Sequence, residues 1–160
     1  MPRIINRLLV IALLMAAAFG ATSGSVALAG KRDGVVTLKS RYSVSETVKR
    51  IKADVAEKGI MLFDDIDQAK LGNAAGNTVR PSRLILFGNP ALGTTFITAN
   101  PASGLDWPVR VLVYQAKDGS VNVAYNDFDW IARRHGIGNR KKEFKMATEV
   151  IESVTSSVRK

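Results

Sequence analysis

An Asp-Gly turn between two alternating stretches limits the folds that this chain can adopt. Residues 109–114 (VRVLVY) and 121–125 (VNVAY) alternate in polarity or are rich in β-branched residues, and Lys117-Asp118-Gly119-Ser120 separates them. Asp-Gly between two such stretches is a strong hairpin signal. We therefore expect two antiparallel strands here, which disfavours a wound parallel sheet.

Three more stretches predict strands, and their neighbours predict helices. The strands are expected at residues 35–41, 60–66 and 83–87. Ser43 and Glu46 have the spacing of a capping box, and the apolar residues after them recur at helical spacing until Gly59. Residues 68–81 are rich in Gly and Asn and are expected to form a loop with at most one helical turn.

Three further helices are expected in the second half of the chain. Asn89 and Pro90 are typical first residues of one helix, and Asn126 or Asp127 can cap a second that runs through His135. The last begins near residue 139, and its apolar stripe is Phe144, Ala147, Ile151, Val154 and Val158. These elements predict a two-layer α+β sandwich, a mostly antiparallel sheet of about five strands backed by helices.

The amino-terminal segment has the three parts of an export signal. Arg3 and Arg7 precede an apolar run at 8–19, and small residues follow up to Ala29. The run has roughly 12 residues, whereas a membrane-spanning helix needs about 20. We therefore expect residues 1–29 to be a signal peptide cleaved near Ala29, and residues 30–160 to be a single periplasmic or secreted domain without a permanent membrane anchor.

Charge and composition exclude several kinds of site. The net charge of +9 favours anionic partners such as lipid head groups or envelope polymers. Nucleic acid is not expected as a partner, because an exported protein rarely meets it. With no cysteine and one histidine, the chain lacks the usual ligands of zinc, and Asp64, Asp65 and Asp67 do not all share one strand face. We expect no metal and no cofactor.

Three segments, taken in order, resemble a known family. They are Phe87-Gly88-Asn89-Pro90 with Gly93-Thr94, residues 107–114 (WPVRVLVY), and Tyr125-Asn126-Asp127 leading to Arg134-His135-Gly136. This pattern is similar to domain-of-unknown-function family 302 and covers residues 40–158. The resemblance implies a TATA-binding-protein-like α+β fold and homodimers, but no activity. Where members often carry Asp-His, this chain has Asp67-Gln68, so no histidine role transfers to that position.

Asp127 and His135 are the candidate catalytic residues. If both reach one cavity, Asp127 could orient His135 as a general base, because imidazole titrates near neutral pH. Helix capping by Asp127 and packing of His135 are the favoured alternative, and no G-x-S-x-G nucleophile motif is present. An enzyme is therefore the less favoured interpretation.

Two other groups of residues are candidates for binding. Asn89, Gly93 and Thr94 lie at a predicted helix start, where free backbone N–H groups can bind an anion, although capping and tight packing explain them as well. A basic cluster, which could dock on anionic lipid, consists of Arg133, Arg134, Arg140, Lys141 and Lys142. The leading hypothesis is an exported, non-enzymatic, homodimeric domain that binds either a small ligand, for which an anion is one candidate, or an envelope partner.

Overall fold

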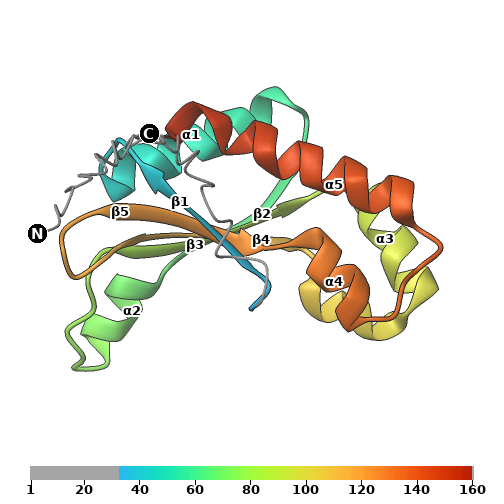
Figure 1. The fold of residues 1–160 in the computed structure, drawn as a ribbon. Coiled ribbons are helices and arrows are strands. Elements are labelled where there is room, and N and C mark those ends of the chain that lie inside the picture. Colours follow the sequence, from blue (N-terminus) through green and yellow to red (C-terminus); the bar gives the residue numbers. More distant parts are fainter. Residues whose placement is uncertain (1–32, 160) are drawn as a thin grey trace, which may run out of the picture.

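The computed structural model describes residues 33–159, and five strands in it form one antiparallel sheet of order β1-β5-β4-β3-β2 (Figure 1). The strands are β1 (Val35–Ser40), β2 (Met61–Asp67), β3 (Ser82–Gly88), β4 (Val109–Gln115) and β5 (Val121–Asn126). The helices are α1 (Val44–Glu57), α2 (Gln68–Ala74), α3 (Pro90–Ala99), α4 (Phe128–Arg134) and α5 (Lys141–Val154), with short 3₁₀ helices η1 (Pro101–Asp106) and η2 (Ser156–Val158). The predicted α+β class with an antiparallel sheet of five strands is confirmed. The proposed signal peptide lies outside the described residues.

One face of the sheet forms the core with helices α1 and α5. Val111 pairs with Tyr125 on one side and with Ile85 on the other, so their side chains share a face. Helices α1 and α5 lie together against this face (Figure 1) and contribute Ile51 and Ile151, both buried. Each such buried side chain stabilises the fold by about 1.5–3 kcal/mol.

Local capping signals determine where most helices begin. The Ser43 hydroxyl accepts the Glu46 N–H at the start of α1, and the Asn89 side chain accepts the Ala91 and Leu92 N–H groups at the start of α3. Both helix starts were predicted. These contacts satisfy N–H groups that a helix cannot pair internally.

The structure differs from the sequence expectation at α2, at the unpredicted η1 and at the end of α5. Residues 68–74 form a helix, α2, because Asp67 directly after β2 accepts the Lys70 N–H and caps it. Helix α5 ends at Val154, where the Thr155 hydroxyl donates to the Ile151 carbonyl, and the chain continues as η2. Val158 is nevertheless buried, as expected.

No helix within residues 33–159 has both the length and the apolar character that crossing a bilayer requires.

The peptide bond between Trp107 and Pro108 is cis, and it connects η1 to β4. Elements η1, α3 and α4 lie at one end of the sheet, whereas α2 lies at the other end (Figure 1).

Candidate functional site

His135 is paired with a carboxylate that the sequence analysis did not identify. Its Nε2 atom lies 2.6 Å from Oδ2 of Asp106, and both side chains are almost completely buried, at 5% and 3% exposure. An ionised carboxylate only accepts hydrogen bonds, so the imidazole donates its Nε2 proton. Asp106 also accepts from Arg134, at 3.3 Å, and from the amide of Asn126, also at 3.3 Å. This cluster joins the end of η1 to the end of α4.

Asp127 has the capping role and does not contact His135. Its Oδ1 accepts the Trp130 N–H at 2.7 Å at the start of α4. Among the described residues, no hydrogen bond connects the side chains of Asp127 and His135. The proposed acid-base pair is therefore corrected: the carboxylate partner of His135 is Asp106. The hollow beside Asp106 has a volume of only about 10 Å³.

Asn89, Gly93 and Thr94 each have a partner within the fold. Asn89 caps α3, and the Thr94 hydroxyl donates to the Pro90 carbonyl at 2.8 Å. A Cβ atom at Gly93 would lie 2.0 Å from the Trp107 ring, so this glycine allows the ring to pack against α3. Asn89 and Trp107 also line a mainly apolar groove of about 370 Å³ between α3 and α5.

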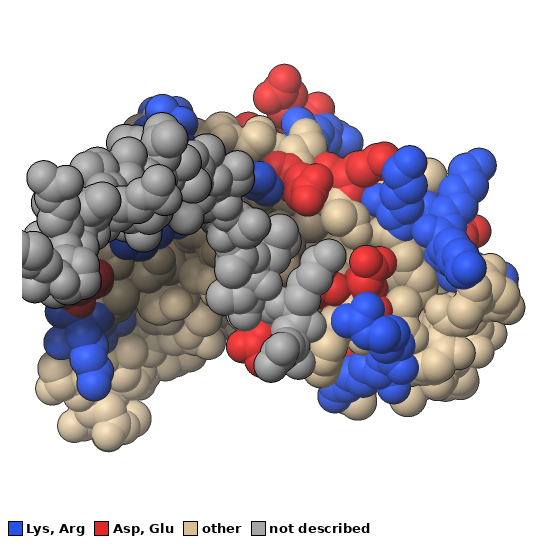
Figure 2. Space-filling view, viewed as in Figure 1, with Lys and Arg blue, Asp and Glu red and all other residues tan. Residues whose placement is uncertain are grey.

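The predicted basic cluster is largely exposed at one end of the molecule. Figure 2 shows Lys and Arg side chains gathered over α4 and the start of α5, with acidic side chains among them. The Arg134 guanidinium lies 5.2 Å from the centre of the Trp130 ring and contacts Asp106. Arg133, Lys141 and Lys142 form no ion pair with any residue in the described part of the chain.

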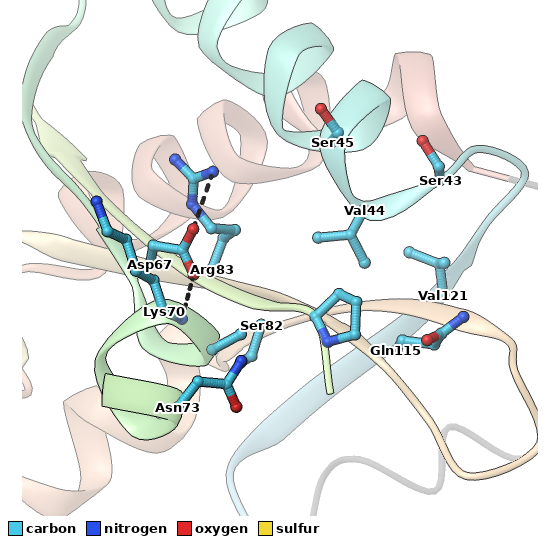
Figure 3. Close-up of a pocket in the computed structure, with 12 residues that line it drawn as sticks. Ser43, Val44, Ser45, Asp67, Lys70, Asn73, Ser82, Arg83, Gln115 and Val121 are labelled. Carbon is cyan, nitrogen blue, oxygen red and sulfur yellow. Dashed lines mark hydrogen bonds and ion pairs between the residues drawn. The ribbon is translucent and has the colours of Figure 1, made fainter. Parts of the chain in front are cut away.

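A larger cavity, lined by residues of α1, α2 and the four strands β2, β3, β4 and β5, lies at the opposite end. Its volume is about 740 Å³, within the range typical of small-molecule sites. Its lining comprises Ser43, Val44, Ser45, Asp67, Ala69, Lys70, Asn73, Pro81, Ser82, Arg83, Gln115 and Val121. In Figure 3, Val44 faces Ser82 across the hollow, and Asp67, Lys70 and Arg83 gather at one side. We call this space the α1–α2 cavity.

The charged side of the α1–α2 cavity has one more cation than carboxylate. Arg83 pairs with Asp65 at 2.7 Å and with Asp67 at 3.8 Å, and Lys52 pairs with Asp65 at 2.9 Å. Lys70 has no ion-pair partner within residues 33–159. Among the residues that line the cavity, Lys70 and Arg83 are cations and Asp67 is a carboxylate, so this side carries a positive charge that a ligand can balance.

Asp65 is ionised and held firmly in this network. Burial alone would raise the pKa of its carboxyl group, but hydrogen bonds from Lys52 and Arg83 outweigh burial and keep that pKa below its usual value. Asp65 and Asp67, two positions apart on β2, both contact Arg83. No group of three or more His, Cys, Asp or Glu side chains is placed to hold a metal ion in the described part of the molecule.

Comparison with known proteins gives one family. The chain matches the family described as Domain of unknown function DUF302 over residues 36–158. It is 38% identical over 106 residues to Fluoride-specific ion channel FluC 1 of Brucella suis biovar 1 (strain 1330), which is 66% of this chain and 42% of that protein. The FluC 1 protein of Brucella abortus biovar 1 (strain 9-941) is also 38% identical over 106 residues, 66% of this chain and 39% of its own length. The chain thus spans less than half the length of each of these curated relatives.

A solved structure shares the fold. The crystal structure of an uncharacterized conserved protein DUF302 from Bacillus stearothermophilus has a TM-score of 0.71 with this chain at 14% identity, and the match covers 79% of this chain and 98% of that one. Since the family match extends from β1 to η2, across the whole sheet and its helices, this chain belongs to the DUF302 family.

Proposed function

We propose that this chain is an exported, non-catalytic binding domain that holds a small ligand in the α1–α2 cavity. The observation that carries this proposal is the cavity itself, of about 740 Å³, which is lined by residues of six elements of the fold. Small-molecule sites are usually preformed hollows of this size with a few polar groups that orient the ligand.

The lining favours a ligand with an apolar body and an anionic group. Val44, Pro81 and Val121 supply apolar surface, while Asn73 and Gln115 supply amides. The excess cation, Lys70, lies at the side where Asp67 and Arg83 already balance each other. An anionic group there completes the charge balance, and the rest of the ligand lies against the apolar wall.

The candidate catalytic residues Asp127 and His135 both have structural partners within the protein, which supports a non-catalytic role. Asp127 caps α4, and His135 donates to Asp106 deep inside the protein. A general base must reach the proton of a substrate within hydrogen-bonding distance. The hollow beside Asp106, of about 10 Å³, is smaller than any organic substrate.

Filling the cavity tests the proposal. Ala69 lines the cavity from α2, a helix with no buried residue, so Ala69→Trp occupies the hollow with little risk to the core. The probe is anilinonaphthalene sulfonate, an apolar fluorescent anion. We expect Ala69→Trp to weaken dye binding by at least about tenfold, or about 1.4 kcal/mol.

Ala74→Trp is the matched control, because Ala74 is exposed on the same helix and does not line the cavity. It should bind the dye like the wild type. Native mass spectrometry of protein purified from its own envelope fraction should also show a retained ligand that Ala69→Trp lacks. Equal dye binding by the two tryptophan variants, or a wild type that neither binds dye nor retains a ligand, contradicts the proposal.

The names of the relatives support the proposal that this chain functions at a membrane. The two Brucella proteins are named as fluoride-specific ion channels, and the matched region is less than half of each. A domain of this family can therefore be part of a protein whose name places it in a membrane. We propose that this chain works in the cell envelope after cleavage near Ala29.

We further propose that the binding domain is a homodimer formed through β2. This strand is at the edge of the sheet, so one side of its backbone has no neighbouring strand within the described residues. Its residues Met61, Leu62 and Phe63 are 52%, 40% and 45% exposed. Exposed apolar edge strands promote pairing with another chain unless they are covered, and a second copy covers both edges at once.

A further inference from the structure

We propose that the end of the molecule opposite the α1–α2 cavity docks on the surface of an anionic phospholipid bilayer. This surface, the basic end, comprises Arg133, Arg134, Arg140, Lys141, Lys142 and Lys145. It extends from the last turn of α4 to the first two turns of α5. This inference is independent of the ligand proposed for the cavity.

Most charges of the basic end are available to a partner. Lys145 forms an exposed pair with Glu149 at 3.7 Å, and Arg134 contacts Asp106. The remaining four cations form no ion pair with residues 33–159. Each Lys or Arg near an anionic bilayer is attracted to it, and several together produce stable, salt-dependent binding.

The cations at the start of α5 destabilise this helix in the isolated domain. Arg140 occupies the N-cap position but makes no side-chain capping hydrogen bond, and Lys141 and Lys142 follow it directly. Cations at this end are unfavourable because the helix macrodipole is positive there. A phosphate head group beside these residues is attracted both to their side chains and to the positive end of the helix dipole, so it offsets the repulsion between them. The start of α5 is therefore more stable at a phosphate-bearing surface than in open solvent.

Apolar and aromatic groups lie next to these cations. The cluster formed by Asp106, Arg134 and His135 fastens η1 to α4, and η1 carries Leu105, which is 62% exposed. Trp130, half-buried, lies beneath the Arg134 guanidinium. Surface cations beside an exposed leucine and a tryptophan are the groups that bind at the boundary between lipid head groups and acyl chains.

The test compares two triple variants that remove the same charge. One is Arg133→Gln/Lys141→Gln/Lys142→Gln in the basic end, and the control is Lys39→Gln/Lys49→Gln/Lys117→Gln, at exposed positions on other parts of the molecule. The mature chain that the proposed cleavage near Ala29 leaves, residues 30–160, is used throughout, so the apolar run at 8–19 does not contribute to binding. Sedimentation with phosphatidylcholine vesicles, with and without phosphatidylglycerol, measures binding.

We expect the wild type and the control to bind vesicles that contain phosphatidylglycerol, and the basic-end variant to bind at least about tenfold more weakly. Added salt should abolish this difference. Leu105→Ser should also weaken binding, whereas Leu71→Ser, at an equally exposed leucine on α2, should not.

Equal binding by the two triple variants, or a difference that salt does not change, overturns the lipid-docking proposal. Ala69→Trp in the cavity should bind vesicles like the wild type. The two proposals therefore fail separately: loss of dye binding concerns only the cavity, and loss of vesicle binding concerns only the basic end.

Discussion

At the scale of single residues, Asp106 organises more of its surroundings than any motif in the sequence suggests. It accepts hydrogen bonds from the side chains of Asn126, Arg134 and His135, which come from β5, α4 and the residue after α4. The Asn100 amide also donates to the His135 carbonyl at 2.8 Å. Because each donor is satisfied inside the protein, the cluster holds η1 against α4.

Removal of Asp106 should therefore destabilise the domain strongly. Asp106→Ala leaves the imidazole of His135 buried without its acceptor, and we expect a loss of about 3 kcal/mol in the free energy of unfolding. Asp127→Ala removes only a helix cap and should cost about 1 kcal/mol. Urea denaturation of both variants measures the difference; equal losses would show that the buried pair contributes little.

At the scale of elements, α3 is held in place by the ring of Trp107. A Cβ atom at Gly88 would lie 2.1 Å from this ring, and one at Gly93 would lie 2.0 Å from it. Two glycines, one at the end of β3 and one in α3, thus make room for one side chain. This close packing explains why Gly93 occurs within a helix, where glycine is usually unfavourable.

Gly93→Ala should be destabilising although alanine favours helices. The new methyl group overlaps the Trp107 ring, which we expect to cost a net of about 1–2 kcal/mol after the gain in helix propensity. Gly104→Ala is the control, because the nearest atom to its added Cβ belongs to Ile97 at 3.9 Å. Thermal unfolding of both proteins measures the effect. A stabilised Gly93→Ala protein would rule out this packing role.

At the scale of the whole molecule, the sheet has two different edges. β1 is paired with β5 and lies at one edge, while β2 lies at the other and exposes the apolar residues 61–63. In the proposed homodimer, the two β2 strands meet. The basic end lies on α4 and α5, outside this pairing, whereas Asp67 at the end of β2 lines the α1–α2 cavity.

Charges placed on β2 should separate the proposed dimer. Met61→Lys/Leu62→Lys introduces four lysines at the interface of a symmetric pair, and we expect the dimer dissociation constant to rise by at least about tenfold. Leu71→Lys, at a leucine that is 61% exposed on α2, should leave the constant unchanged. Sedimentation equilibrium measures both. A monomeric wild type would refute the dimer itself.

Much of the fold could be predicted because its signals are local. Ser43, Asn89 and Asp127 cap the helices that follow them, and the Asp118-Gly119 turn connects two paired strands. The site could be predicted only in part. His135 was identified, but its partner Asp106 lies 29 positions away in a 3₁₀ helix without a recognisable motif.

The amino-acid sequence by itself determined the α+β class, the hairpin, most helix boundaries, the family and the presence of the basic cluster, since each depends on neighbouring residues or on a family-wide pattern. Only the tertiary structure decided that β1 lies beside β5, that Asp106 is the partner of His135, and that α1, α2 and four strands line a common cavity. These features arise where segments far apart in the chain meet. Such meetings depend on the packing of the whole core and not on any local pattern.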